Sequence, residues 1–132
     1  MKKLTLLFTV ILCGCFFAKL DQSKAKVVVE SLIKAENSGD YSGMSQYYTV
    51  DFNEGEPLDS RVTKFKLLHE TLGDLTGMEL MSIKDSTDPN ELPCVYVIYK
   101  VKHTKINSVE KFTIINDEGT YKAEQHSIDM NR

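Results

Sequence analysis

The chain has 132 residues, of which 42% are hydrophobic, and its 16 basic and 19 acidic residues give a net charge of −3. This length suffices for one domain with its own hydrophobic core and is short for two. A mildly acidic chain without a basic cluster lacks the Lys and Arg side chains that supply most of the affinity for phosphate backbones. Nucleic acid is therefore not expected as a partner.

The start of the chain has the features of a secretory leader. Lys2 and Lys3 precede the apolar run Leu4 to Leu12, which only threonines interrupt. A basic start followed by a short apolar segment and small residues is typical of a signal peptide. Apolar or small residues continue only to Ala18, fewer than the roughly 18 to 20 that a membrane-spanning helix needs. We therefore expect a cleaved leader rather than a transmembrane helix.

The end of this leader resembles the bacterial lipoprotein signal, in which a Leu lies three residues before the modified cysteine and a Gly or Ala lies one residue before it. Leu12, Gly14 and Cys15 match these positions. The resemblance implies cleavage before Cys15, a diacylglyceryl thioether on its sulfur and, in many species, a further acyl chain such as palmitate on its amino group. Two or more such chains hold a protein stably on a membrane. The alternative is an unmodified Cys15 and a free periplasmic protein.

These features predict the organisation of the whole chain. Residues 1–14 are expected to be the lipoprotein signal peptide, residues 15–23 the lipidated cysteine with a short tether, and residues 24–132 a single domain. The expected location is the bacterial cell envelope, on the outer membrane where the organism has one. Loss of the leader and acylation of Cys15 leave Cys94 without an intramolecular partner, so we expect no disulfide and a buried Cys94.

Apolar residues at helical spacing predict a first helix over residues 25–37, capped by Asp21 or Ser23 and ended by the glycine at position 39. A short second helix is expected at about residues 41–48, followed by a loop over residues 53–57. Asp59 or Ser60 is expected to open a third helix that ends before Gly73. Its predicted core-facing stripe is Leu58, Val62, Phe65, Leu68 and Leu72.

From Leu75 the sequence pattern changes to the alternation of β-strands. The clearest strand is residues 94–103, and its apolar start predicts burial on both faces there. Residues 109–116 and 120–130 are expected to form a hairpin in which Gly119 takes a positive φ. Helices followed by an antiparallel four-stranded meander predict an α+β domain with the helices on one face of the sheet.

This pattern resembles the nuclear-transport-factor-like (cystatin-like) fold. The residues that carry the resemblance are the first helix with Gly39-Asp40-Tyr41 after it, the Tyr47-Tyr48 to Asp51-Phe52 junction, Leu72-Gly73, and the paired strands Tyr96 to Val101 and Glu110 to Ile115. The resemblance implies N-terminal helices packed on a curved, cone-like sheet that encloses a pocket. Members of the family that are enzymes place an Asp, His or Tyr in this pocket.

Five residues are candidates for such a role: Tyr48, Asp51, His69, His103 and His126. A buried Asp51 would have the raised pKa of a general base, whereas a solvated or helix-capping Asp51 would have no such role. His69-Glu70 begins like a zinc-protease motif, but Gly73 stands where a second His is required. No Cys or His spacing predicts a zinc site, so we expect neither a metal nor a cofactor.

The positions of the three histidines in their elements predict their exposure. His69 is expected at the surface or boundary of its helix, and His103, which follows Lys102 at the end of a strand, is expected to be exposed. Simple alternation places His126 on the same face as Lys122 and Glu124.

Three functions are compatible with this sequence. The first is a membrane-anchored, non-enzymatic module that binds a protein or a small ligand. The second is an enzyme that uses Asp51 or a histidine in the pocket, which requires that residue to be buried, hydrogen-bonded and facing a cavity. The third is an immunity or inhibitor protein that blocks an envelope hydrolase.

Overall fold

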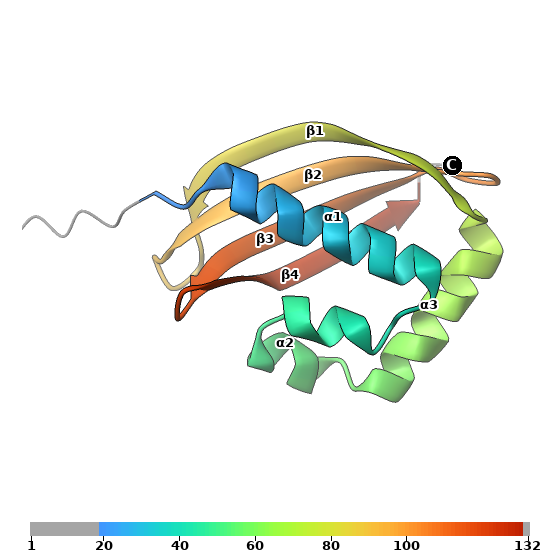
Figure 1. Cartoon of the computed structure of the whole chain (residues 1–132), viewed down its shortest axis with the longest axis horizontal. Helices are drawn as coiled ribbons and strands as arrows, with labels where there is room; N and C mark the ends of the chain where they lie inside the picture. Colours follow the sequence, from blue (N-terminus) through green and yellow to red (C-terminus); the bar gives the residue numbers. More distant parts are fainter. Residues whose placement is uncertain (1–18, 131–132) are drawn as a thin grey trace, which may run out of the picture.

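The computed structural model describes residues 19–130, so the predicted leader and Cys15 lie outside the described residues. The helical elements come first and the strands follow: α1 (Gln22–Ser38), the 3-10 helix η1 (Gly43–Tyr47), α2 (Val50–Gly55), α3 (Leu58–Leu72), β1 (Leu75–Thr87), β2 (Pro93–His103), β3 (Ser108–Asp117) and β4 (Thr120–Met130). The strands form one antiparallel sheet in the order β1-β2-β3-β4. Figure 1 shows α1 lying across one face of this curved sheet. The predicted α+β architecture is confirmed.

The first helix begins and ends as its sequence predicts. The Asp21 carboxylate accepts hydrogen bonds from the backbone N–H of Ser23 and Lys24, which are otherwise unpaired at a helix N-terminus. Gly39 ends the helix with a φ of 81°, the left-handed conformation that glycine adopts most readily. α1 starts inside the segment expected as a tether. Its buried stripe packs on the sheet and consists of Ala25, Val28, Val29, Leu32, Ile33 and Glu36.

The region after α1 differs from its prediction. The expected second helix is the short 3-10 helix η1, and the expected loop over residues 53–57 is helical as far as Gly55. The reason lies just before that loop, where the Thr49 hydroxyl accepts a hydrogen bond from Phe52 N at 3.2 Å and so caps α2. Asp51 adds a negative charge in the first turn, where it interacts favourably with the helix dipole.

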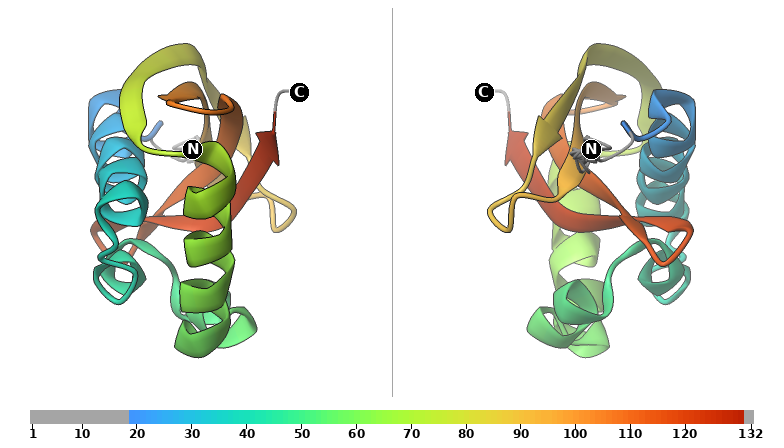
Figure 2. Two further views of the ribbon diagram at one scale, coloured as in Figure 1. Left: turned by 90° about the vertical axis from the view of Figure 1, so that its right-hand side faces the viewer. Right: turned by 90° about the vertical axis from the view of Figure 1, so that its left-hand side faces the viewer.

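The third helix buries only part of its predicted stripe. Phe65 and Leu72 are buried, but Leu58 is 46% exposed. Arg61, one turn before Phe65, is instead almost completely buried at 1% exposure. Figure 2 shows α3 standing beside the curved sheet as a helix separate from α1.

The sheet buries one face against the helices. Val95, Val97, Tyr99 and Val101 of β2 lie in the core. Tyr96 is 39% exposed, so the prediction of burial on both faces at the start of β2 is wrong: among the described residues the helices cover only the opposite face. Cys94 is buried, as expected. None of the helices in residues 19–130 has the length and apolarity needed to span a membrane.

The β3–β4 hairpin contains the feature that determines the site. Its turn has positive φ at Glu118 and Gly119, as predicted for Gly119. Further along, Thr113 pairs with Gln125 but Ile114 pairs with Ala123, so Glu124 is an extra residue in β4. Such a β-bulge shifts the alternation of the strand by one residue. Side chains beyond it therefore face opposite to the direction that simple alternation predicts.

Candidate functional site

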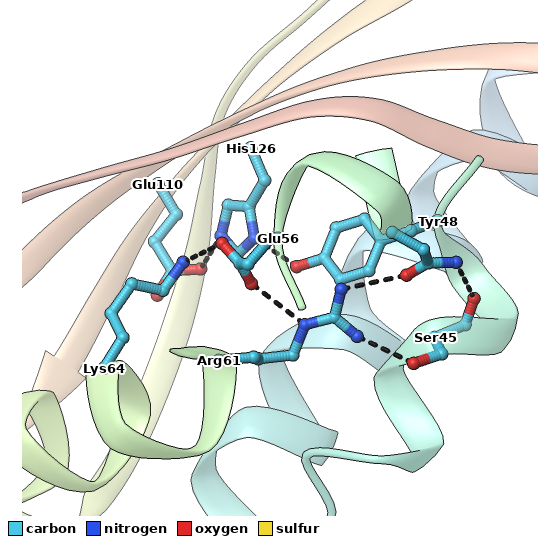
Figure 3. Close-up of polar contacts among 8 residues, drawn as sticks. Ser45, Tyr48, Glu56, Arg61, Lys64, Glu110 and His126 are labelled. Atoms are coloured by element: carbon cyan, nitrogen blue, oxygen red, sulfur yellow. Dashed lines mark hydrogen bonds and ion pairs between the residues drawn. The ribbon is translucent and has the colours of Figure 1, made fainter. Parts of the chain in front are cut away.

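A polar network lies between the helices and the last two strands (Figure 3). The Tyr48 hydroxyl lies 2.6 Å from Nδ1 of His126, and Nε2 of His126 lies 3.1 Å from Oε2 of Glu110. The side chains of His126 and Glu110 are only 2% and 1% exposed. Because a carboxylate only accepts hydrogen bonds, the Nε2–H of His126 donates to Glu110. This network is thus buried and hydrogen-bonded throughout.

A second carboxyl group completes the network from α1. Burial, together with the negative charge of Glu110, raises the pKa of Glu36 well above its ordinary value. Burial would raise the pKa of Glu110 too, but hydrogen bonds from Glu36 and His126 hold it below its ordinary value. Of the two acids, Glu36 is thus the one that keeps its proton to higher pH, beside the carboxylate of Glu110.

Arg61 of α3 contacts this network through its buried guanidinium group. Its guanidinium donates to Glu56 Oε1 at 2.9 Å, to Ser45 Oγ at 2.8 Å and to Asn53 Oδ1 at 2.9 Å. It also lies 4.8 Å from the centre of the Tyr48 ring. A charge this deeply buried requires such pairing. Arg61 therefore joins α3 to η1 and α2 and fixes the ring that contacts His126.

The electrostatics around Arg61 follow from the same contacts. Burial alone would raise the pKa of Glu56, but hydrogen bonds from Lys64 and Arg61 hold it below its ordinary value. Burial, with the charges of Glu36 and Glu56, raises the pKa of Tyr48. Tyr48 therefore remains a neutral phenol at any ordinary pH.

The cone interior is nearly full. Its cavity measures about 20 Å³ and is lined by Glu36, His69, His103 and Glu110 with apolar neighbours from α3 and β4. This is room for about one water molecule, whereas pockets for organic ligands measure about 300 to 1,000 Å³.

One group within the interior has the composition of a metal site. Ligand atoms of Glu36, Glu110 and His126 lie within 4.8 Å of one another. An ion placed there would have to displace the Nε2 proton through which His126 bonds to Glu110. Glu36 Oε2 is buried and has no hydrogen-bond partner.

The predictions for two histidines are wrong. His126 does not lie with Lys122 and Glu124, because the bulge at Glu124 turns it to the core face, where it stacks on Phe112 at 4.2 Å between ring centres. His103 is buried rather than exposed, and its Nε2 lies 3.2 Å from Ser108 Oγ. Burial lowers the pKa of His103. The structure thus brings Tyr48 and His126 together, with His103 on the wall of the same interior.

The other two candidates lie at the surface. His69 is at the boundary of α3, where its Nε2 lies 3.1 Å from Oδ1 of the exposed Asp74. Asp51 is exposed in the first turn of α2 and takes no part in the Tyr48 network.

Asp51 lines a second feature, which we call the acidic hollow. It measures about 450 Å³ and lies between the start of α2, the β1–β2 loop and the hairpin end of β3 and β4. Four carboxylic acids line it, and none of the described residues around it is basic. The acids are Asp51, Asp88, Asp117 and Glu124, and the other lining residues are Thr49, Val50, Pro89, Asn90, Leu92, Ile115 and Gln125.

A shallow hollow of about 550 Å³ lies on the sheet face away from the helices. Tyr96 and Ile98 form its apolar part, and Lys84 and Lys111 add positive charge. These two large hollows thus lie on the surface and not in the cone.

Comparison with known proteins finds a solved structure with a similar fold. No protein-family model matches the sequence, and no curated protein matches it significantly. Among solved structures, an NTF-2-like protein of unknown function from Silicibacter pomeroyi is similar with a TM-score of 0.60 at 13% identity, over 83% of this chain and 94% of that one. The chain has an NTF-2-like fold. At this identity the likeness concerns the fold alone.

Three residues of the site in this NTF-2-like chain were missed by reasoning from the sequence: Glu36, Arg61 and Glu110. Each occupies an apolar position of its element, since Glu36 follows Leu32 by one turn, Arg61 precedes Phe65 by one turn, and Glu110 alternates with Phe112. A charged residue in an apolar stripe was the available signal. It does not reveal which residues pair with one another.

Proposed function

We propose that the protein is a membrane-anchored lipoprotein of the bacterial envelope whose NTF-2-like domain is a non-enzymatic module that binds a protein or a small ligand. The observation that carries this proposal is the distribution of space. The cone interior has a cavity of only about 20 Å³, whereas the acidic hollow on the surface measures about 450 Å³. A ligand of ordinary size fits the second and not the first.

The enzyme alternative finds less support. A general base must come within about 2.6 to 3.2 Å of the proton that it removes. Both ring nitrogens of His126 are already within hydrogen-bonding distance of Tyr48 and Glu110, and its side chain is only 2% exposed. Asp51 is exposed and separate from this network. An inhibitor or immunity protein would be a form of the binding function in which the ligand is an envelope hydrolase.

The short distance from Cys15 to the fold supports action close to a membrane. Asp21 caps α1, and Leu20 already packs against the core. Residues 16–21 span at most about 20 Å when fully extended. An acylated Cys15 would therefore hold the domain against the bilayer, with its surface hollows near the membrane.

The anchor is tested by metabolic labelling with palmitate and by cell fractionation. We expect label and membrane association for the natural chain, loss of both for Cys15→Ser, and no change for the matched variant Cys13→Ser. An unlabelled natural chain recovered in wash fractions would show that the proposed location is wrong.

The binding role is tested separately in intact cells. A photo-crosslinking amino acid placed at Asn90, on the rim of the acidic hollow, is expected to give a defined adduct. The same amino acid at Leu67, which is exposed on α3, serves as the control. Equal adducts at both positions, or none at Asn90, would contradict binding at this surface.

A further inference from the structure

Three side chains from α1, β3 and β4 have the spacing of metal ligands inside the cone. One ligand atom each of Glu36, Glu110 and His126 lies within 4.8 Å of the other two. Nε2 of His126 and Oε2 of Glu110, which Figure 3 shows facing each other, are 3.1 Å apart. In a tetrahedral zinc site with bonds of about 2.1 Å, neighbouring ligand atoms are about 3.4 Å apart. An ion therefore fits between these side chains after small rotations.

One of the ligand atoms has no partner in the protein. Glu36 is only 6% exposed, and its Oε2 is buried and accepts no hydrogen bond. A buried acceptor without a donor is costly. The cations of α3 do not relieve this cost, because Arg61 and Lys64 both pair with Glu56. A cation bound beside Glu36 would satisfy the oxygen.

The charges of the three side chains also match a divalent ion. When ionised, Glu36 and Glu110 carry two negative charges, and a neutral His126 adds none. Buried charges are tolerated when they are paired or bind a metal. A divalent ion bound to both carboxylates leaves the interior at this point without net charge.

We propose that Glu36, Glu110 and His126 bind a zinc ion that joins α1 to β3 and β4. This inference goes beyond the proposed binding function and does not depend on it. Imidazole nitrogen and carboxylate oxygen are typical zinc ligands, whereas calcium and magnesium take oxygen ligands. Three protein ligands leave one tetrahedral position, and the adjoining cavity of about 20 Å³ has room for one water molecule.

The second ring nitrogen of His126 already has a suitable neighbour. The Tyr48 hydroxyl lies 2.6 Å from Nδ1. Zinc on Nε2 moves the ring proton to Nδ1, which then donates to the Tyr48 oxygen. A histidine that binds a metal usually donates its other N–H in this way, which fixes the ring. Zinc binding therefore requires a change of tautomer at His126.

The acid pair in the acidic hollow does not offer a comparable site. Asp88 Oδ2 and Glu124 Oε1 are also buried without a partner. Burial, and then the charge and hydrogen bond of Asp88, raise the pKa of Glu124 to about 7. Within residues 19–130, the group that brings three ligand atoms together is the one at Glu36. Asp88 and Glu124 lack a third ligand.

The test must allow for the burial of the site. The side chains of Glu110 and His126 are 1% and 2% exposed, so the ion enters as the chain folds or opens. The full-length chain is unfolded in urea with EDTA and refolded with zinc, with calcium or without metal. We expect one zinc per chain after desalting. With free zinc at about 100 times the dissociation constant, the thermal midpoint should rise by about 10 °C. Calcium should leave it unchanged.

Nitrogen-15 NMR of the histidine rings tests the ligand in the natural chain, without any substitution. The ring proton of His126 is expected on Nε2 in the metal-free protein and on Nδ1 after refolding with zinc. A His126 proton that stays on Nε2 in the zinc-loaded protein would overturn the proposal.

Glu36→Gln removes one ligand and keeps a neutral donor beside Glu110, so the metal-free variant is expected to fold. Loss of a hydrogen bond that supports a metal ligand costs roughly 10- to 100-fold in affinity, and loss of the ligand itself should cost at least as much. The control is Asp74→Asn, which breaks the exposed pair of Asp74 with His69 and should leave zinc binding unchanged.

Three results would overturn the proposed site. They are no zinc retained by the natural chain, a midpoint raised equally by calcium, and a zinc affinity that falls with Asp74→Asn as much as with Glu36→Gln. The last result would assign the zinc to the surface. None of these measurements involves the acidic hollow or Cys15, so their failure leaves the proposed binding function and the anchor intact.

Discussion

His126 hydrogen-bonds across the hairpin to Glu110, Nε2 to Oε2 at 3.1 Å, although its direct partner on β3 is Phe112. The extra residue Glu124 produces this arrangement, because it turns His126 to the core. The same bulge leaves Glu124 itself outside the core, where it lines the acidic hollow. One inserted residue thus places a histidine in the buried network and a carboxyl group in the proposed binding site.

The buried carboxyl pair should respond unequally to the same substitution. Glu110→Gln places amide N–H groups where Glu36 and His126 already donate, and should lower the free energy of unfolding by about 1–3 kcal/mol. Burial raises the pKa of Glu36, so Glu36→Gln, which keeps a neutral donor beside Glu110, should cost less than about 1 kcal/mol. Urea denaturation of the two variants measures both values. Equal losses would show that Glu36 is ionised.

Arg61 should matter far more than its neighbour Lys64, although both pair with Glu56. Arg61→Met leaves three polar partners without their donor, and removal of one member of a buried charged pair costs about 3–5 kcal/mol. Lys64→Met removes a pair at the surface and should cost less than about 1 kcal/mol. Thermal or urea unfolding of the two variants gives the comparison. Similar losses in both would contradict a structural role for the Arg61 cluster.

The general architecture could be predicted because it depends on local signals. Asp21 and Gly39 mark the ends of α1, and the alternation in β2 sets its buried face. The burial of His126 could not be predicted, because a bulge changes the face of every later residue and nothing local in β4 announces it.

The partners in the buried network were hidden for a different reason. Glu36 and Glu110 lie far apart in the chain and meet only when α1 packs on the sheet. Arg61 sits at an apolar position of α3, where helical periodicity alone predicts a hydrophobic residue. The buried guanidinium of Arg61 is stabilised by hydrogen bonds to Ser45, Asn53 and Glu56 of the preceding elements.

Glu124 should make the fold less stable as the pH rises. Between its ordinary pKa near 4.5 and its folded value of about 7, the folded chain keeps a proton that the unfolded chain has lost. Stability must fall with pH over this interval. Glu124→Gln cannot titrate, so its urea midpoint should decline less from about pH 5 to pH 8 than that of the natural chain. Parallel pH profiles for the two proteins would show that the Glu124 carboxyl is not held protonated by Asp88.

Two glycines at open positions should respond in opposite ways to alanine. A Cβ at Gly119 or at Gly55 would meet no atom within 4 Å, so neither substitution changes packing. Gly119 has a φ of 91° in the hairpin turn, and Gly119→Ala should lower the free energy of unfolding by about 1 kcal/mol, since alanine is strained there.

Gly55 ends α2 without a positive φ. Gly55→Ala should therefore raise stability by about 0.5 kcal/mol, because alanine restricts the unfolded chain and favours the helix. The urea midpoints of the two variants are compared with that of the natural chain. Opposite changes would show that backbone conformation, and not the space around the added Cβ, determines the effect. A loss at Gly55 as large as that at Gly119 would mean that α2 does not extend to that residue.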